Sequence, residues 1–226
     1  MFSRDELIVK ANEFYSKETS EPNGRYHSWE ICYSVFYNAR QNKDRDYDNL
    51  SLHLGFYLAS WGMMRSSSFL LEKDYTVHME VVKEILKEEY DCLLGIEFKD
   101  YNADMLVKLI ALRDKIKSHY DEVREKIRVG LKTSKVTDTL ITKVLMGTLG
   151  CVPSYDKYLC IALKDGLGTQ KTFNRKSMED LISFYENNCN LFEVERSKMK
   201  INDMIVYPQM KFLDMGLWGI GKELDN

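Results

Sequence analysis

The chain has 226 residues, of which 44% are hydrophobic and 30% charged, a composition typical of globular proteins. The formal net charge is −3, so no overall positive field attracts nucleic acid or anionic lipid, and any DNA binding must come from a local basic patch. No apolar run approaches the roughly 20 residues of a membrane-spanning helix, and the acids near the amino terminus are unlike a signal peptide. We therefore expect a cytoplasmic protein without a membrane partner.

The pattern of the first half is helical, with apolar residues recurring every three or four positions. Ser3 and Glu6 form a capping-box pattern at the start of the first helix, and Asn102 begins a long one. Residues 50–64 are apolar on nearly every side, which predicts the most deeply buried helix. In chain order, the helices predicted here cover residues 3–17, 26–40, 50–64, 75–90 and 102–127.

The second half predicts shorter helices. Gly147 and Gly150 can end the first of them, Ser154 can cap the second, and Pro208 suits the first turn of the last. These helices are predicted at residues 139–147, 155–163, 178–188 and 208–221.

The element pattern predicts an all-α fold of about nine helices. We find no repeat and no run of alternating strand residues. No linker rich in Pro, Gly and Ser divides the chain, so we expect one helical domain over residues 1–226. A seam near residues 95–102 is compatible with two helical lobes and a cleft between them.

The cysteines and histidines give no sign of a metal site. The five cysteines are odd in number and none has the C-x-x-C spacing, and the four histidines are scattered. We expect reduced, buried thiols, no bound metal and no cofactor. The cysteines are Cys32, Cys92, Cys151, Cys160 and Cys189.

Asp156 is the residue whose position most needs explanation. It lies in GCVPSYDKYL, residues 150–159, among apolar neighbours where a helix is predicted to begin. With Ser154 as the cap, Asp156 falls in the first helical turn, where unpaired N–H groups favour an ionised carboxylate. Such a group can stabilise a positively charged transition state, or it can simply compensate the helix dipole. The sequence gives both interpretations equal weight.

Two segments resemble the helix-hairpin-helix DNA glycosylase superfamily. TDTLITKVLMGTLGCVPSYDKYL, residues 137–159, is similar to the family's hairpin, helix and V-P-x-D-like strip, whose Asp opens the following helix and is catalytic. MKFLDMGLWGIG, residues 210–221, is similar to the ending of distant members. Within that ending, Asp214 and Trp218 lie four residues apart and are expected to be structural.

The resemblance implies two interleaved helical lobes with a cleft, and a hairpin and catalytic-Asp element over residues 124–163. It implies that Asp156 stabilises an oxocarbenium-like transition state while a modified base is removed from DNA. No cysteine tetrad is present for an iron–sulfur cluster.

Three features depart from the family pattern. LKTSKVTDTLITK, residues 131–143, replaces the glycine-rich hairpin that would hold a DNA phosphate, and two residues instead of one separate Pro153 from Asp156. Lys143 is too close in sequence to Asp156 to match the lysine nucleophile of strand-cutting members, so we expect base removal without strand cleavage. The altered hairpin suggests an unusual substrate, such as the modified bases of phage DNA, and hence a role in antiviral defence.

Positive charge gathers on both sides of Asp156. Residues 124–143 carry a net charge of +4 and residues 164–176 one of +3, although solvated faces often carry such runs. The candidates for contact with the DNA backbone are Lys132, Lys135 and Lys143, together with Arg65 and Ser66 after the helix at 50–64.

A base that leaves the DNA stack needs a pocket with aromatic walls and hydrogen-bonding groups. The candidates are Trp29, Glu30, Trp61 and Tyr155. The alternative for the two tryptophans is the ordinary core, and the alternative for Glu30 is a surface salt bridge.

Two other functions compete with DNA base excision. Arg113, Asp114 and His119 on the helix at 102–127 loosely resemble the signature of HEPN-type ribonucleases, although a spacing of six residues does not put Arg113 and His119 on one helix face. A non-enzymatic helical adaptor would instead show an exposed apolar stripe on that helix.

Overall fold

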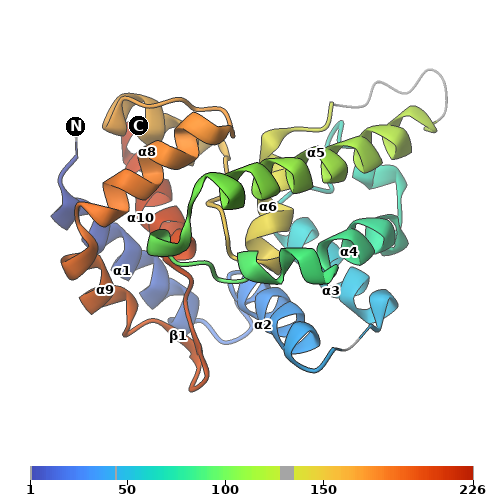
Figure 1. Cartoon of the computed structure of the whole chain (residues 1–226), viewed down its shortest axis with the longest axis horizontal. Helices are drawn as coiled ribbons and strands as arrows, with labels where there is room; N and C mark the ends of the chain where they lie inside the picture. The colour runs from blue at the N-terminus through green and yellow to red at the C-terminus, as the bar shows by residue number, and fades with distance from the viewer. Residues whose placement is uncertain (1, 44, 128–134, 226) are drawn as a thin grey trace.

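The computed structural model describes residues 2–43, 45–127 and 135–225 and is almost entirely helical (Figure 1). The all-α class is confirmed, with ten α-helices in the described residues against about nine predicted. They are α1 (Arg4–Ser20), α2 (His27–Gln41), α3 (Tyr47–Ser60), α4 (Met79–Ile85), α5 (Ala103–Glu125), α6 (Asp138–Thr148), α7 (Lys157–Ile161), α8 (Arg175–Glu186), α9 (Cys189–Arg196) and α10 (Gln209–Leu224).

Shorter elements connect these helices. A π-helical turn, η5 (Ala162–Leu167), continues α7, and a two-stranded antiparallel hairpin, β1 (Lys200–Asn202) and β2 (Ile205–Val206), was not predicted. The 3₁₀ turns are η1 (Phe69–Glu72), η2 (Tyr75–His78), η3 (Glu88–Leu93) and η4 (Phe98–Asp100). The helix predicted at 75–90 is therefore three pieces, of which only α4 is α-helical.

Helix starts follow the sequence where a side-chain cap is unambiguous. Ser3 and Glu6 form the predicted capping box of α1, and Asn102 accepts a hydrogen bond from the Met105 N–H at the start of α5. The end of α6 differs from the prediction. Gly147 lies inside the helix, where a Cβ would come within 2.5 Å of the Tyr57 ring, and Gly150, at φ +63°, makes the turn after it.

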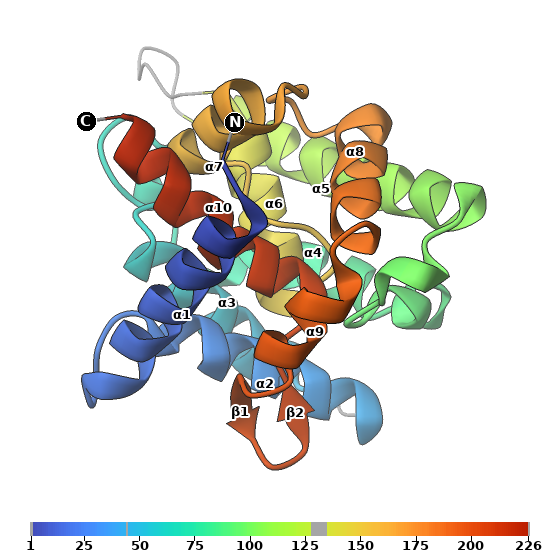
Figure 2. The ribbon, with the colours of Figure 1, turned by 90° about the vertical axis from the view of Figure 1, so that its left-hand side faces the viewer.

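The helices gather in two groups (Figure 1). One group holds α1, α8, α9 and α10, and the other holds α2 to α6. Within the first, α1 lies along α10 in both views (Figure 2), and Gly216 permits this approach because a Cβ there would lie 2.8 Å from the Leu7 carbonyl oxygen. The buried apolar side chains form one cluster that includes residues of both groups.

The chain passes between the groups at residues 21–26 and again after α6. Residues 149–156 lead from α6 to α7, which packs on α10. The predicted seam, residues 95–102, is hydrogen-bonded to both groups. The Gly95 N–H donates to the carbonyl of Leu149, just after α6, at 2.7 Å, and the Phe98 N–H donates to Gln209 Oε1 of α10 at 2.6 Å. None of the described helices is both long enough and apolar enough to cross a lipid bilayer.

Candidate functional site

Asp156 is itself the cap of α7. Its Oδ1 accepts hydrogen bonds from the Tyr158 and Leu159 N–H groups, both at 3.1 Å, and its backbone is extended, with φ −85° and ψ −178°. The prediction that Ser154 caps this helix is wrong, because Ser154 is already bonded elsewhere and α7 begins only at Lys157. The cap uses one carboxylate oxygen and leaves the other, Oδ2, for a different partner.

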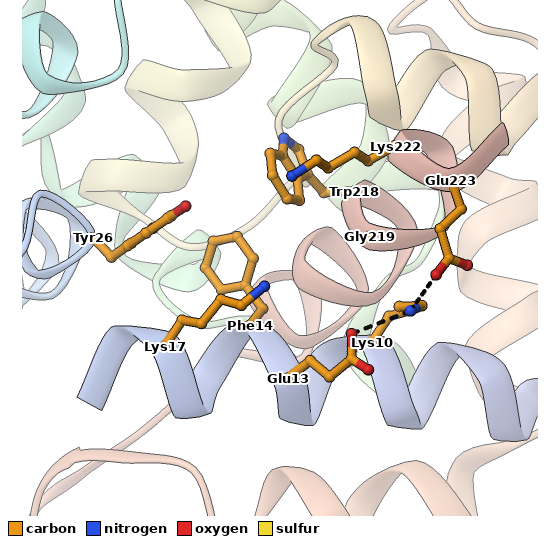
Figure 3. Close-up of a pocket in the computed structure, with 9 residues that line it drawn as sticks. All are labelled: Lys10, Glu13, Phe14, Lys17, Tyr26, Trp218, Gly219, Lys222 and Glu223. Carbon is orange, nitrogen blue, oxygen red and sulfur yellow. Dashed lines mark hydrogen bonds and ion pairs between the residues drawn. The ribbon is translucent and has the colours of Figure 1, made fainter. Parts of the chain in front are cut away.

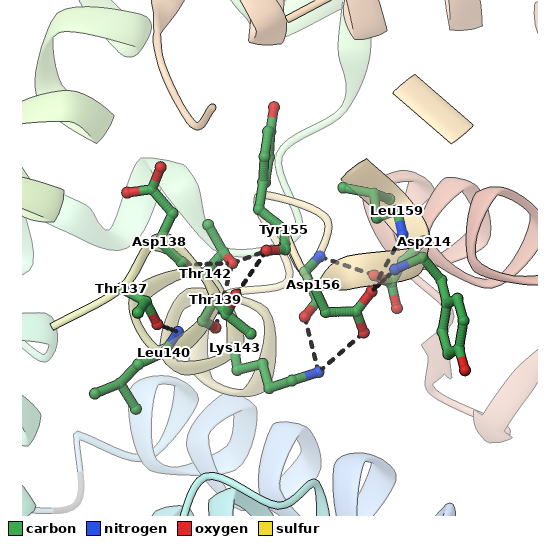
Figure 4. A network of polar contacts seen from close by, with 12 residues as sticks. Thr137, Asp138, Thr139, Leu140, Thr142, Lys143, Tyr155, Asp156, Leu159 and Asp214 are labelled. Carbon is green, nitrogen blue, oxygen red and sulfur yellow. Dashed lines mark hydrogen bonds and ion pairs between the residues drawn. The ribbon is translucent and has the colours of Figure 1, made fainter. Parts of the chain in front are cut away.

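That partner is Lys143, in the middle of α6. Its Nζ lies 3.5 Å from Asp156 Oδ2 and donates to Ser154 Oγ at 2.9 Å (Figure 4). The Lys143 side chain is 5% exposed and that of Asp156 is 17% exposed. The sequence places these residues 13 positions apart, yet the chain turns back on itself between them and brings their charges together.

Threonines of α6 fix the strip that leads to Asp156. Thr142 Oγ1 accepts the Tyr155 N–H at 2.9 Å, and the Thr139 hydroxyl donates to the Tyr155 carbonyl at 2.8 Å (Figure 4). Both backbone groups of Tyr155 are thereby satisfied by one helix. Tyr155, the residue before Asp156, is therefore fixed to α6, which restricts where the Asp156 carboxylate can lie.

A second buried acid and base come from α10. Asp214 Oδ1 accepts the Ser154 N–H at 2.8 Å, and Lys211 Nζ lies 3.5 Å from Asp214 Oδ2. Lys211 is 2% exposed and Asp214 is 9% exposed. Asp214 is therefore not merely a residue of the last helix, since it binds the strip that carries Asp156.

Burial shifts the pKa values of both members of the Lys143–Asp156 pair. Burial raises the pKa of Asp156, nearby Asp214 raises it further, and Lys143 opposes the rise. Burial likewise lowers the pKa of Lys143, although Asp156 and Asp214 oppose the fall. The expectation that a helix start alone keeps Asp156 ionised is thus too simple, because desolvation acts against the helix N-terminus.

Aromatic rings surround the two lysines. Lys143 Nζ lies 5.0 Å from the centroid of the Trp61 ring, and Lys211 Nζ lies 4.8 Å from the centroids of both Phe14 and Trp29. Phe14 stacks on Trp61 with centroids 6.3 Å apart. The Trp61 Nε1 atom is buried and has no hydrogen-bond partner among the described residues, so the site holds one unused donor.

A pocket of about 200 Å³ opens beside this cluster, between α1 and α10 (Figure 3). Phe14, Tyr26 and Trp218 provide its aromatic surface. Phe14 and Tyr26 both contact Trp61, which connects the pocket to Lys143. The volume is below the roughly 300–1,000 Å³ of pockets for drug-sized ligands, so it suits a group of one or two rings.

The rim of the pocket is basic. Lys17 and Lys222 line it, and Arg25 lies 5.3 Å from the Tyr26 ring centroid. None of these three cations forms an ion pair with a described residue. Lys10 also lines the pocket, but Glu13 and Glu223 neutralise it (Figure 3).

None of the four predicted base-pocket residues lines this pocket, and of their side chains the Trp61 ring is the one that packs on two of its lining rings, Phe14 and Tyr26. Trp29 is fully buried below it and donates its N–H to the Met146 carbonyl. Glu30 accepts from the Tyr207 hydroxyl at 2.7 Å and pairs with His27. Tyr155 is 2% exposed, and its hydroxyl bonds Ser177. Trp29, Glu30 and Tyr155 are therefore structural in this arrangement.

The predicted DNA-backbone residues separate into three groups. Arg65, Ser66 and Lys135 line one shallow groove of about 270 Å³ at the start of α6, and neither Arg65 nor Lys135 pairs with a described acid. Lys143 is buried against Asp156, so it is not the exposed cation that was predicted to contact DNA phosphates. Lys132 lies outside the described residues.

The basic stretch at 164–176 is largely neutralised. Arg175 pairs with Glu179 and Lys176 with Asp180, each at 2.7 Å. This stretch therefore offers less free charge than its sequence indicates.

Arg113 and His119 do not share a partner in the structure, and the apolar stripe of α5 is not exposed. Arg113 donates to the Phe173 carbonyl at 3.0 Å, whereas His119 contacts the Val77 carbonyl at 3.4 Å, so the two residues have separate partners on different elements. The apolar stripe of α5 is buried, and it consists of Leu106, Leu109, Leu112, Ile116 and Tyr120.

Several residues of the site were not predicted from the sequence. Phe14 and Tyr26 come from the amino-terminal helices, and Lys211 lies in an apolar stretch near the carboxyl end. The one available signal was Lys211 itself, a charged residue within the apolar run MKFLDMGLWGIG.

Comparisons with known proteins give no match, whether to a protein family, to a curated protein or to a solved structure. Among the described residues, no group of three or more histidine, cysteine or acidic side chains is placed to hold a metal ion. The interpretation of the site therefore depends on its own geometry.

Proposed function

We propose that the chain is a DNA glycosylase that excises a modified base, with Asp156 as the catalytic carboxylate. The observation that carries the proposal is the Asp156 carboxylate, whose Oδ2 pairs with buried Lys143, which Trp61 and Phe14 connect to an aromatic pocket with a basic rim. Breaking the bond between base and sugar builds positive charge on the sugar, and a fixed carboxylate stabilises that charge. The same oxygen can accept a proton from the attacking water.

The pocket supports recognition of one extruded base. Aromatic rings bind a base by stacking, and Phe14, Tyr26 and Trp218 offer such faces. Bases hypermodified in phage DNA are the substrate class we propose, with antiviral defence as the biological role.

Two surfaces support contact with the DNA backbone. The unpaired cations at the pocket rim would meet phosphates beside the extruded nucleotide, and the groove with Arg65 and Lys135 lies at the amino terminus of α6. A helix N-terminus with nearby cations favours a phosphate group. This local charge replaces the overall positive field that the chain lacks.

One observation favours a second mechanism for the same reaction, in which an amine replaces water as the nucleophile. Lys143 is buried, its pKa is lowered, and its nitrogen lies beside the carboxylate. A neutral amine there can attack the sugar carbon, so that a carbon–nitrogen bond forms as the base leaves with the electrons of its bond. The prediction of base removal without strand cleavage rested on sequence spacing, and the ion pair of Lys143 with Asp156 supports considering the amine as an alternative nucleophile.

The test uses duplexes that each carry one modified base, including glucosylated and other bulky cytosines. We expect free base from at least one duplex, with strand breaks only after alkali if water is the nucleophile. Breaks without alkali, and a borohydride-trapped complex that Lys143→Arg abolishes, would assign the amine. Absence of base release from every modified duplex would refute the proposed function.

The matched variants are Asp156→Asn and Asp104→Asn. Asparagine at 156 keeps a capping oxygen for α7 but removes the negative charge, so we expect base release to fall at least about 100-fold with DNA binding retained. Asp104 is exposed on α5, and its variant should match the wild type. Equal activity of the two variants would show that Asp156 only caps the helix.

A further inference from the structure

We propose that Lys211 and Asp214 of α10 are positioning residues that act on Lys143 and Asp156. Asp214 holds Ser154, in the segment between Lys143 and Asp156, and Lys211 acts as a second buried cation. The catalytic meaning of this inference rests on the proposed function. The physical coupling itself does not, because it follows from the contacts of four charged side chains, three of them buried and Asp156 half-buried.

The four side chains form one continuous path. It runs from Lys211 Nζ to Asp214 Oδ2 at 3.5 Å, and from Asp214 Oδ1 to the Ser154 N–H at 2.8 Å. It continues from Ser154 Oγ to Lys143 Nζ at 2.9 Å, and from there to Asp156 Oδ2 at 3.5 Å. The Ser154 N–H thus binds Asp214, and the Ser154 hydroxyl binds Lys143, which lies beside Asp156.

The two lysines share one aromatic ring. Lys143 Nζ lies 5.0 Å and Lys211 Nζ 5.8 Å from the centroid of Trp61. Like charges that are both withdrawn from water repel strongly, because the low local dielectric screens them little. Protonated Lys211 therefore favours the neutral form of Lys143, in the way that a neighbouring cation activates other lysine nucleophiles.

The charged groups that face Lys143 are few. Asp156 comes from the start of α7, and Lys211 and Asp214 come from α10. α2 and α3, which also pack on α6, contribute the uncharged rings of Trp29 and Trp61 near these lysines. The charge on α10 is consequently the main outside influence on the Lys143–Asp156 pair.

This arrangement predicts shifts of opposite sign for two substitutions. Lys211→Met removes a repelling cation and leaves Asp214 without its partner, so the pKa of Lys143 should rise. Asp214→Asn keeps an oxygen for the Ser154 N–H but removes an attracting anion, so the pKa of Lys143 should fall. A residue that served only packing would not produce opposite shifts.

The experiment is an NMR titration of the full chain with lysine labelled with ¹³C at the ε carbon. The signal that disappears in Lys143→Arg identifies Lys143, and its chemical shift against pH gives the pKa in each variant. Lys198→Met, just after the end of α9, removes a lysine that pairs with Glu195; it is the matched control and should leave the pKa of Lys143 unchanged. Lys211→Gln replaces Lys211→Met if the latter does not fold.

Shifts of the same sign in the Lys211 and Asp214 variants, or no shift in either, would overturn the inference. The titration needs neither DNA nor base release, so it can succeed while the proposed function fails. If the glycosylase is confirmed, the acid limb of its pH profile should move to lower pH in Asp214→Asn, because loss of the neighbouring anion lowers the pKa of Asp156.

Discussion

The Lys143–Asp156 pair makes a prediction about stability that is independent of any substrate. Lys143→Met leaves the Asp156 carboxylate largely buried without the cation that lies 3.5 Å away. The carboxylate can escape this penalty only by taking up a proton. At pH 7 that uptake costs about 1.4 kcal/mol for each pH unit above the ordinary pKa of 3.8, which sets an upper limit of about 4 kcal/mol. We expect a loss of about 2–4 kcal/mol, near the range for breaking buried ion pairs.

The pH dependence of this loss has a definite sign. In Lys143→Met the folded-state pKa of Asp156 rises further above its unfolded value, so the folded state holds more protons than the unfolded state between the two values. Stability of the variant relative to the wild type therefore falls as pH rises from about 4 to about 7. Near pH 4, where the unfolded carboxyl group is also half protonated, the difference should be small.

Urea unfolding of a double-mutant cycle measures the coupling. The single variants are Lys143→Met and Asp156→Asn, and asparagine preserves the cap of α7. We expect the double variant to be more stable than the sum of the single losses predicts, by about 1–3 kcal/mol. Additive losses, or a loss in Lys143→Met that does not vary with pH, would refute the reasoning that these two charges are coupled in a dry site.

Three further predictions concern residues outside that pair. Replacing both Arg65 and Lys135 by alanine should weaken DNA binding and reduce the slope of log affinity against log salt by about 2. Filter binding at several salt concentrations measures this slope. An unchanged slope would show that the groove does not contact DNA. Tyr155→Phe should lower stability by about 1 kcal/mol and leave base release intact, because its hydroxyl bonds Ser177 and does not face the pocket; a large loss of release at unchanged stability would return Tyr155 to the site. Gly216→Ala should lower the melting temperature measurably, because the new Cβ would meet the Leu7 carbonyl at 2.8 Å, and an unaltered melting temperature would contradict the close packing of α1 on α10.

Local signals predicted most of the secondary structure, and failures occurred where tertiary contacts compete with them. Asn102 begins α5 as expected, because few other groups compete for its side chain. Ser154 has the residue type of a cap, yet its N–H and hydroxyl are bound by Asp214 and Lys143 from other elements. Asp156 takes over the cap two residues later. No local rule could reveal that competition, because both competitors come from elsewhere in the chain.

The site was predictable only in part for the same reason. Asp156 and Trp61 were candidates from residue type and position. Lys143 was assigned to the DNA backbone because positive charge in a basic stretch is normally exposed, whereas the fold buries it at the side of the acid. Phe14 and Lys211 lie nearly 200 residues apart in the sequence, and only the packing of α1 along α10 brings the ring and the ammonium group within 4.8 Å.

The composition of the site argues against a purely structural role for Asp156. Capping α7 needs one oxygen, which Oδ1 supplies and which asparagine would supply equally well. The second acid and the two buried lysines add desolvation costs of several kcal/mol per ion, and apolar side chains of similar volume would generally give equal or greater stability. Folding alone therefore does not explain why four charged groups meet under three aromatic rings. The proposed function would use the carboxylate to stabilise positive charge on a bound sugar and the neighbouring charges to adjust the protonation of one amine.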